Sequence, residues 1–292
     1  MISKISLGTV QFGQHYGIAN TRGQVPKNEA LEILDYATGV GINNLDTAFA
    51  YGESELIIGE YLAQHKNSFK IVSKLPSLEP YRAGKIEAFL EQSFKSLKVE
   101  RLYGYLLHRF NDILVSDDVW NDLVRLKRNG SIEKIGFSLY SPDELIFLLD
   151  HGVEFDILQV PYSIFDRRFE EYFGLLNQKK VEIQARSIFL QGLAFLNSDE
   201  LPESVEKAKD SLKILKNLSE KANIPINALC LNFVLLNSNI DHAVIGVDSL
   251  SHLKSNVEDL RYFSQVEALK ESLTSLAIDD EDILLPYRWS RA

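Results

Sequence analysis

Cysteine is almost absent from this chain of 292 residues, which contains only Cys230. A single cysteine cannot form an internal disulfide, which excludes a disulfide-stapled secreted scaffold. The 16 glycines and 8 prolines are too few for a collagenous or low-complexity chain. No apolar run approaches the roughly 18–20 residues that span a bilayer, and the first residues lack the apolar core and cleavage site of a signal peptide. These absences predict a cytoplasmic protein without a membrane segment.

Basic residues are outnumbered by acidic ones, 31 against 41, which gives a net charge of −10. Nucleic acids and acidic membranes bind to basic surfaces, so neither is an expected partner. The six histidines are scattered without the spacing of a metal site, so we expect no metal. Glycine-rich phosphate loops and the Gly-x-Ser-x-Gly motif of hydrolases are also missing. A local basic pocket for one phosphorylated ligand remains open.

Short apolar runs alternate with longer amphipathic segments along most of the chain. Apolar residues make up 45% and charged residues 25%, which is typical of a soluble globular protein. Eight strand–helix units of roughly 30–36 residues each fit an α/β fold, the (β/α)8 TIM barrel. The alternative is a doubly wound sheet with a small second domain, but no linker marks a boundary. The predicted strands are residues 4–7, 43–45, 70–73, 102–107, 132–137, 155–160, 181–185 and 242–245.

We therefore expect a single barrel domain over residues 1–292. Ser141 before Pro142 is a predicted helix N-cap, and Gly41 is expected to end a helix in the left-handed conformation. Residues from about 264 to 292 fit neither pattern and are expected to form a tail that packs on the barrel. Helices are predicted within residues 27–38, 54–63, 83–97, 117–127, 141–149, 167–176, 202–236 and 250–260. Cys230 lies in an apolar helical pattern and should be a buried, inert thiol.

Polar residues stand where three successive strands are expected to end. Asp46 ends the second predicted strand, Lys74 the third and His108 the fourth, and Tyr51 follows Asp46 on the same loop. The carboxyl ends of barrel strands converge on one mouth, so these four side chains should face one cavity. Taken singly, each has an ordinary alternative: a helix cap, a solvated charge, a core histidine and a packing aromatic.

Together the four residues have a defined chemistry. A tyrosine hydroxyl with a pKa near 10 is a poor acid at pH 7, and a nearby Lys74 ammonium should lower that pKa. Asp46 would hold the ammonium in place, and His108 would orient a carbonyl oxygen. The group would then supply a proton donor and an oxyanion site to a carbonyl that receives a hydride.

The sequence also carries a long family signature. Residues 41–48, with Tyr51 and Gly52, resemble the signature of the aldo-keto reductase family in its bacterial form. The resemblance implies a (β/α)8 barrel that reduces aldehydes and ketones with a nicotinamide cofactor, usually NADPH, and without a metal. It makes Tyr51 the general acid. Further matches are Leu7–Thr9, Ile135–Ser138, Leu158–Tyr162, Phe189–Leu193, Val244–Gly246 and Asn256.

The same resemblance implies a set of cofactor contacts. Ser138 and Gln159 match positions that hold the nicotinamide carboxamide, and Arg186 falls where the family usually stacks an aromatic residue on the nicotinamide ring. A guanidinium plane can also stack on such a ring. The remaining implied cofactor contacts are Thr9, Asp46, Ser187, Leu190, Gly192, Ile245, Gly246, His252 and Asn256.

Several positions depart from the family pattern. Leu139 stands where many members have asparagine, and the hairpin that often closes the barrel floor is expected to be absent, with residues 287–289 covering part of that floor. Gly246 and His252 occupy positions that are often basic in NADPH-preferring members, and Asp248 adds a negative charge nearby. We therefore expect a relaxed choice between NADP and NAD.

Other functions stay open at this stage. A regulatory or binding protein on the same scaffold would have weak turnover, and a barrel enzyme of non-redox chemistry would bind neither nicotinamide cofactor. The substrate is expected to be a small carbonyl compound. Arg109 beside Phe110 would suit a polar or anionic one, such as a sugar-derived aldehyde, although a surface salt bridge is an equal alternative. Phe12, Phe49 and Tyr162 are further candidates for the pocket lining. No sequence feature indicates an oligomeric state.

Overall fold

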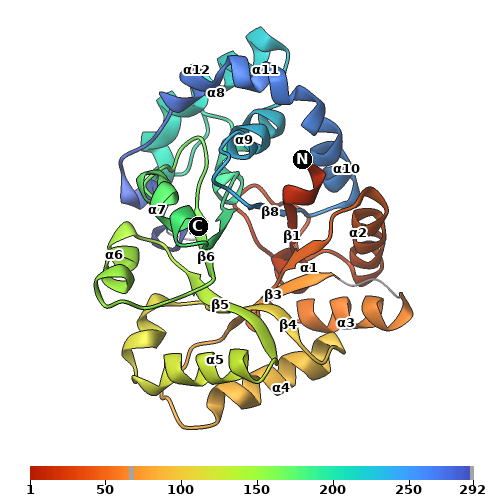
Figure 1. The fold of residues 1–292 in the computed structure, drawn as a ribbon. Coiled ribbons are helices and arrows are strands. Elements are labelled where there is room, and N and C mark those ends of the chain that lie inside the picture. The colour runs from red at the N-terminus through yellow and green to blue at the C-terminus, as the bar shows by residue number, and fades with distance from the viewer. Residues whose placement is uncertain (66–68, 290–292) are drawn as a thin grey trace.

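Eight parallel strands form a closed barrel in the computed structural model, which describes residues 1–65 and 69–289 (Figure 1). This confirms the predicted (β/α)8 fold, and each predicted strand is present within two residues of its expected bounds. The strands are β1 (Ile5–Gly8), β2 (Asn44–Asp46), β3 (Lys70–Leu75), β4 (Leu102–Leu107), β5 (Ile132–Ser138), β6 (Ile157–Pro161), β7 (Glu182–Arg186) and β8 (His242–Gly246).

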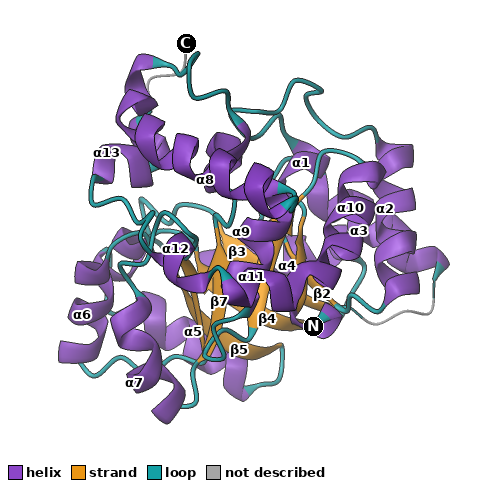
Figure 2. Ribbon diagram, turned by 90° about the horizontal axis from the view of Figure 1, so that it is seen from above, coloured by secondary structure: helices purple, strands orange, loops and turns teal. Residues whose placement is uncertain are grey.

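Helices surround the strands on the outside of the barrel (Figure 2). The predicted cap at Ser141 is confirmed: its side chain accepts from the Asp143 amide, and the Glu144 side chain completes a capping box. Gly41 ends a helix with a φ of 90°, also as predicted. The helices are α1 (Val10–Gly13), α2 (Lys27–Val40), α3 (Ser54–Gln64), α4 (Lys85–Leu97), α5 (Asp118–Arg128), α6 (Pro142–Asp150), α7 (Phe173–Gln178), α8 (Lys209–Ala222), α9 (Ile226–Leu235), α10 (Leu250–Glu258), α11 (Phe263–Ala268), α12 (Lys270–Thr274) and α13 (Glu281–Leu284).

The long segment predicted over residues 202–236 is divided. A 3-10 turn, η5 (Glu203–Ala208), leads into α8, and α9 starts separately after Pro225. Asn223 ends α8 in the left-handed conformation, and a proline cannot continue a helix, which explains the break.

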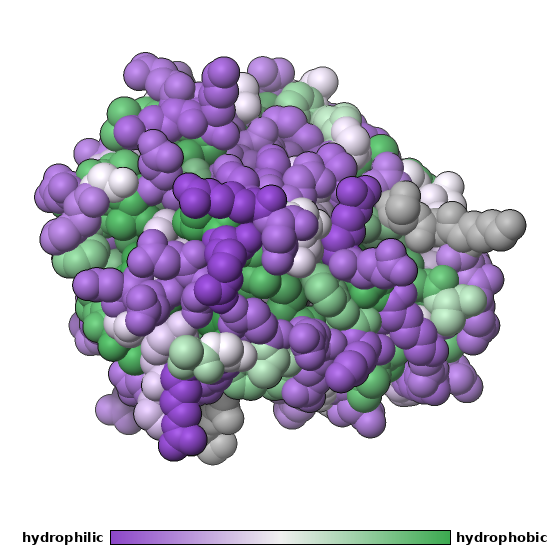
Figure 3. Space-filling view, turned by 60° about the horizontal axis from the view of Figure 1, so that its bottom comes forward, coloured by the Kyte–Doolittle hydropathy of each residue, from purple (hydrophilic) through white to green (hydrophobic). Residues whose placement is uncertain are grey.

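Cys230 is fully buried in α9, as expected. Polar side chains cover most of the face drawn in Figure 3, with apolar residues between them.

A polar cluster around Glu182 fills the barrel where the strands begin. Lys134 donates to Glu182 Oε2 at 2.6 Å, Tyr103 donates to the same oxygen, and Gln184 donates to Oε1 at 2.8 Å. Within the described part of the chain, β1 is preceded by the 3-10 turn η1 (Ile2–Lys4) and not by a hairpin, as expected. Side chains from the strands themselves therefore occupy the floor.

The last segment of the chain runs from α11, which packs against α9, to η7 (Pro286–Arg288) beside the barrel mouth. The Ile278 amide donates to the Phe165 carbonyl at 2.8 Å, and the Tyr287 ring meets the Tyr140 ring edge-on at 5.4 Å. Phe165 and Tyr140 follow β6 and β5, so the idea that residues 287–289 cover the floor is wrong. Residues 290–292 of the predicted tail lie outside the described residues, and the single-domain assignment stays a prediction. None of the helices in residues 1–65 and 69–289 is long and apolar enough to cross a membrane.

Candidate active site

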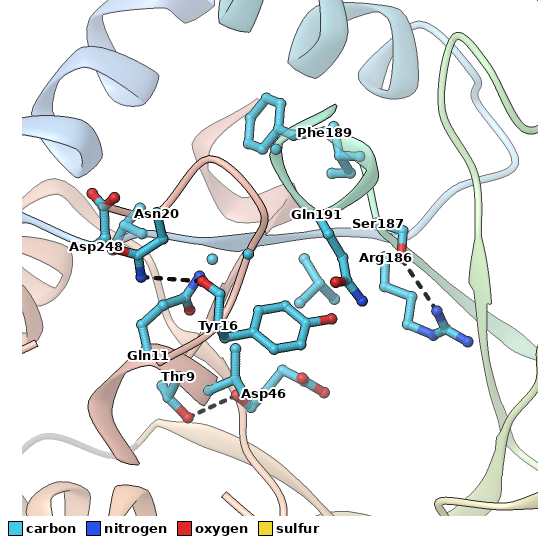
Figure 4. A pocket seen from close by; sticks show the side chains of 18 of the residues that line it. Thr9, Gln11, Tyr16, Asn20, Asp46, Arg186, Ser187, Phe189, Gln191 and Asp248 are labelled. Atoms are coloured by element: carbon cyan, nitrogen blue, oxygen red, sulfur yellow. Dashed lines mark hydrogen bonds between the residues drawn. The ribbon is translucent and has the colours of Figure 1, made fainter. Parts of the chain in front are cut away.

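A cavity of about 530 Å³ opens at the carboxyl ends of the strands (Figure 4). Its lining comes from the ends of seven of the eight strands or the segments after them, together with Asn227 of α9. Lys74, Leu190 and Ile245 do not line it and lie buried behind it. The predicted residues that do line it are Thr9, Asp46, Tyr51, His108, Ser138, Gln159, Arg186, Ser187, Gly192, Gly246, His252 and Asn256.

Asp46 and Lys74 form an ion pair under the cavity. The Lys74 Nζ donates to Asp46 Oδ1 at 2.6 Å and to the Thr47 carbonyl at 3.0 Å. The Lys74 side chain is 1% exposed, which rules out a solvated charge, and Asp46 stands in β2 and not at a helix cap. Burial lowers the pKa of Lys74, while the Asp46 carboxylate opposes that shift.

The Tyr51 loop is fixed by an approach that only glycines allow. A Cβ on Gly13 would stand 1.7 Å from the Tyr51 carbonyl oxygen, and one on Gly52 would stand 2.5 Å from the Gly13 oxygen. Gly52 also has a φ of 55°, in the left-handed region. These two contacts lock the loop against α1.

Hydroxyl groups hold the base of the same loop. The Thr9 hydroxyl donates to the Asp46 carbonyl at 2.9 Å and accepts from Ser54 at 2.8 Å, and Ser54 lies 3.0 Å from the Thr47 hydroxyl. All four residues are buried. The Thr9 hydroxyl therefore orients β2, and its predicted contact with the cofactor stays a prediction.

We expect Gly13→Ala to displace the Tyr51 loop. The new methyl group cannot coexist with the Tyr51 carbonyl, and a misplacement of about 1 Å typically costs about 100-fold in rate. Turnover and thermal unfolding should both fall. Gly39→Ala in α2 is the matched control, because nothing lies within 4 Å of that Cβ, and it should raise stability by up to about 1 kcal/mol. Wild-type turnover in Gly13→Ala would contradict this account of the loop.

The Tyr51 side chain is half-buried at the cavity wall, beside the ion pair. Lys74 Nζ lies 5.3 Å from the centre of its ring. Burial raises the pKa of Tyr51 well above 10, and the Asp46 carboxylate raises it further. Any lowering of this pKa by Lys74 is therefore outweighed by burial and by the Asp46 carboxylate, and the expected net decrease is wrong. The phenol stays protonated at neutral pH, which is the form that donates a proton.

His108 stands on the other side of Tyr51. The two rings meet edge-on at 5.7 Å. Burial, with added repulsion from Lys74 and Arg186, lowers the pKa of His108 to about 3. The imidazole is therefore neutral at pH 7 and can hydrogen-bond a carbonyl oxygen without adding charge to the site.

Gln159 connects the mouth to the barrel interior. Its Nε2 donates to Asp46 Oδ1 at 2.7 Å and to Gln184 Oε1 at 3.2 Å, and Gln184 in turn donates to Glu182. Both amide hydrogens are thus used inside the barrel. Among the described residues no donor pairs with Gln159 Oε1, which leaves that oxygen to accept from a carboxamide.

Arg186 at the end of β7 is held by neutral partners. Its Nη2 donates to the Leu139 carbonyl at 2.7 Å and its Nη1 to the Ser187 hydroxyl at 3.2 Å. Its Cζ lies 4.0 Å from the centre of the Tyr140 ring. The guanidinium therefore already stacks on an aromatic residue of this chain.

Several lining residues escaped the sequence reasoning. Tyr16 points its ring into the cavity between Asp46 and Arg186 (Figure 4), and burial raises the pKa of Tyr16 to about 12. Strand ends were the only positional signal in the sequence, and these residues come from longer loops. The missed residues include Gln11, Tyr16, Asn20, Tyr140 and Gln191.

The far end of the cavity carries acidic groups. Asp248 contacts the His252 ring, and Arg22 donates to the Asp248 carbonyl at 2.8 Å while pairing with Glu29 at 2.9 Å. Lys254 points elsewhere, over the Tyr36 ring. The one arginine at this end therefore already has a carboxylate partner.

The loop between α1 and α2 crosses the cavity. The Ile18 amide donates to the Gln191 carbonyl at 2.8 Å, and a Cβ on Gly192 would meet the Ala19 Cβ at 2.8 Å. The loops after β1 and β7 thus meet over the cavity. They lie so close together that residue 192 has no room for a side chain.

Other candidates fall outside the cavity. Phe12 and Tyr162 are buried in the core, Arg109 is exposed, and neither Phe49 nor Phe110 lines the cavity, so these five are wrong as lining residues. A search of the residues that the structure describes found no group of three or more His, Cys, Asp or Glu side chains that could hold a metal.

Comparison with known proteins gives consistent matches. The sequence profile of the Aldo/keto reductase family matches residues 4–278. The uncharacterized oxidoreductase YqkF of Bacillus subtilis is 25% identical over 280 residues, covering 88% of this chain and 87% of its own. The NADH-specific methylglyoxal reductase of Escherichia coli is 25% identical over 300 residues, covering 89% and 90%. In fold, the chain is similar to the holo form of the aldo-keto reductase AKR11C1 from Bacillus halodurans, with a TM-score of 0.75 at 22% identity, covering 95% of this chain and 93% of that one.

Proposed function

Because the chain is an oxidoreductase of the aldo/keto reductase family, we propose that it reduces an aldehyde or ketone to an alcohol with NADH or NADPH and with Tyr51 as the general acid. The observation that carries this proposal is the protonated Tyr51 phenol, which lines the cavity between the Asp46–Lys74 pair and a neutral His108.

Each residue of the group has one task. A bound nicotinamide supplies the hydride that reaches the carbonyl carbon. The neutral His108 ring orients the carbonyl oxygen, and Tyr51 donates its proton to that oxygen as negative charge develops. The Lys74 ammonium beside Tyr51 stabilises the phenolate that this transfer leaves, and Asp46 keeps Lys74 in place.

The residues of the cavity fit a nicotinamide dinucleotide. Gln159 Oε1 would accept from the carboxamide, with Ser138 beside it at the end of β5. Gly246 lines the cavity, and a Cβ there would stand 2.7 Å from Gln11 Nε2, so the glycine leaves that space to the Gln11 side chain. The other proposed contacts are Thr9, Asp46, Arg186, Ser187, Gly192, His252 and Asn256, whereas the predicted contacts Leu190 and Ile245 lie buried behind the lining.

The test is cofactor binding followed by turnover. NADH and NADPH fluorescence should change on mixing with the protein, and a panel of aldehydes and sugar-type carbonyls should oxidise one of them. Absence of binding to both cofactors would reject a redox function and favour non-redox barrel chemistry. Binding without turnover across the panel would favour the regulatory alternative. The cytoplasmic location stays a prediction.

The low pKa of His108 predicts a pH profile without a histidine step. An ordinary histidine titrates near 6.5, whereas His108, at about 3, stays neutral above pH 4. We expect kcat/KM to show no inflection between pH 5 and 8.

The same pKa predicts how stability changes with pH. In the unfolded chain His108 binds a proton below about pH 6.5, and in the folded chain it does not, so acidification should lower the free energy of unfolding. His108→Asn should lose less stability than wild type between pH 7 and pH 5. An inflection near pH 6.5 that disappears in this variant would contradict the assignment.

The acidic far end of the cavity predicts weak discrimination for NADPH. A 2′-phosphate carries close to two negative charges and prefers an unpaired Arg or Lys, but Arg22 is paired with Glu29 and Asp248 lines the cavity. We expect NADH to be accepted comparably or preferred. Asp248→Ser should tighten NADPH and leave NADH unchanged, while Asp210→Ser on α8 controls for net charge. A hundredfold tighter Kd for NADPH in the wild type, about 2.7 kcal/mol, would contradict this prediction.

A further inference from the structure

The substrate end of the cavity holds a cation without an acidic partner. Lys74 is neutralised by Asp46, but no Asp or Glu among residues 1–65 and 69–289 lies within salt-bridge distance of Arg186. The Arg186 Nε is buried and has no hydrogen-bond partner among those residues. The Arg186 side chain as a whole is half-buried, and a charge shielded from water is costly unless it is paired. This end of the cavity therefore carries one positive charge in excess, in a protein whose net charge is −10.

The guanidinium is also fixed before any ligand arrives. The Leu139 carbonyl and the Ser187 hydroxyl hold its Nη atoms, the Tyr140 ring covers one face, and Tyr287 packs against that ring. Such a fixed fork binds a carboxylate with little further loss of side-chain freedom.

The direction in which the Arg186 side chain points favours a contact with the substrate. In Figure 4 its guanidinium points away from the end that holds Asn20 and Asp248, and it contacts Leu139 and Tyr140, which follow β5. The positive charge of Arg186 acts on His108 and Tyr51. Its contribution lowers the pKa of His108 and partly offsets the raised pKa of Tyr51. A carbonyl held by Tyr51 and His108 would thus have its substituents near this cation.

We propose that Arg186 binds the anionic group of the substrate, and that the enzyme acts on carboxylate-bearing aldehydes or ketones. This inference rests on the proposed function and adds the substrate class to it. It assigns the anion to Arg186 and not to the exposed Arg109. A face contact with the nicotinamide ring is compatible, because a guanidinium binds an anion through its edge.

The test uses two aldehydes that differ at one substituent, the anionic 4-formylbenzoate and its uncharged methyl ester. We expect wild-type kcat/KM to favour the acid by about tenfold or more, mainly through KM, because a charge-assisted fork is about twice as strong as neutral hydrogen bonds. Arg186→Gln should bring the ratio close to one, and Arg186→Lys should keep part of it. Arg109→Gln is the matched control and should leave the ratio unchanged. A wild-type ratio near one would overturn the proposal.

Binding measurements separate a substrate role of Arg186 from a cofactor role. The Kd of NADH is measured for each variant. If Arg186→Gln weakens NADH binding and lowers kcat/KM equally for both aldehydes, Arg186 serves the cofactor and the proposal is wrong.

Calorimetry measures the binding of 4-(hydroxymethyl)benzoate and of its methyl ester, and needs no turnover. Wild type should bind the acid more tightly than the ester. This preference should fall in Arg186→Lys and disappear in Arg186→Gln, and circular dichroism checks that each variant folds. Failure of wild type to bind the acid would overturn the inference, whereas binding without turnover would count only against the proposed function.

Discussion

Tyr51→Phe should lower kcat by roughly 10²–10⁴-fold, the usual contribution of general acid catalysis. The substitution keeps the ring that packs beside His108 and removes only the hydroxyl, so the cavity keeps its shape. NADH or NADPH binding should change little, and the free energy of unfolding should stay within about 1 kcal/mol of wild type, since only one hydroxyl is lost. Steady-state kinetics and cofactor fluorescence check both expectations.

A matched control is Tyr36→Phe in α2, which removes a hydroxyl outside the cavity. Its turnover should equal that of wild type. Near wild-type turnover in Tyr51→Phe would reject Tyr51 as the proton donor, and a parallel loss of cofactor affinity would mean that the hydroxyl positions the cofactor instead.

Lys74→Met should lower both activity and stability. It removes the charge that stabilises the Tyr51 phenolate, and it leaves the Asp46 carboxylate buried without its cation, which typically costs about 3–5 kcal/mol. Chemical denaturation measures the stability, and turnover with the best carbonyl substrate measures the activity.

The double variant Asp46→Asn with Lys74→Met separates the two losses. It contains no unpaired carboxylate, so it should recover much of the stability while turnover stays low. If Lys74→Met unfolds like wild type, the pair adds nothing to stability and the buried-charge account is wrong. If the double variant regains turnover, Lys74 has no part in the proton transfer.

The positions of the strand-end residues followed from the sequence because barrel geometry leaves little freedom. Asp46 ends β2, Lys74 is the residue before the end of β3 and His108 directly follows β4, and parallel strands of one barrel end at the same mouth. The ion pair and the shared cavity could therefore be expected before the loops were known. The same argument placed Ser138 and Gln159 beside them.

The loops could not be predicted in the same way. Tyr16 and Tyr140 reach the cavity through backbone paths that no periodicity encodes. The direction of the Tyr51 pKa is set first by desolvation and then by the Asp46 carboxylate, and the extent of both depends on how the loops pack. Tail residue Tyr287 packs at the mouth because its partner Tyr140 lies there, and no local pattern identifies that partner.

The seam between β1 and β8 has a consequence for how the chain folds. Leu7 pairs in register with Ile245, so the first strand finds its second neighbour only when nearly the whole chain is available. Until then β1 and β7 are open edges, which other chains can extend by strand pairing. Contacts between residues so distant in sequence also close slowly, because the entropy of the intervening chain is lost before they form. Closure of this seam turns an open sheet into a cooperative barrel, and that step is where folding and aggregation compete.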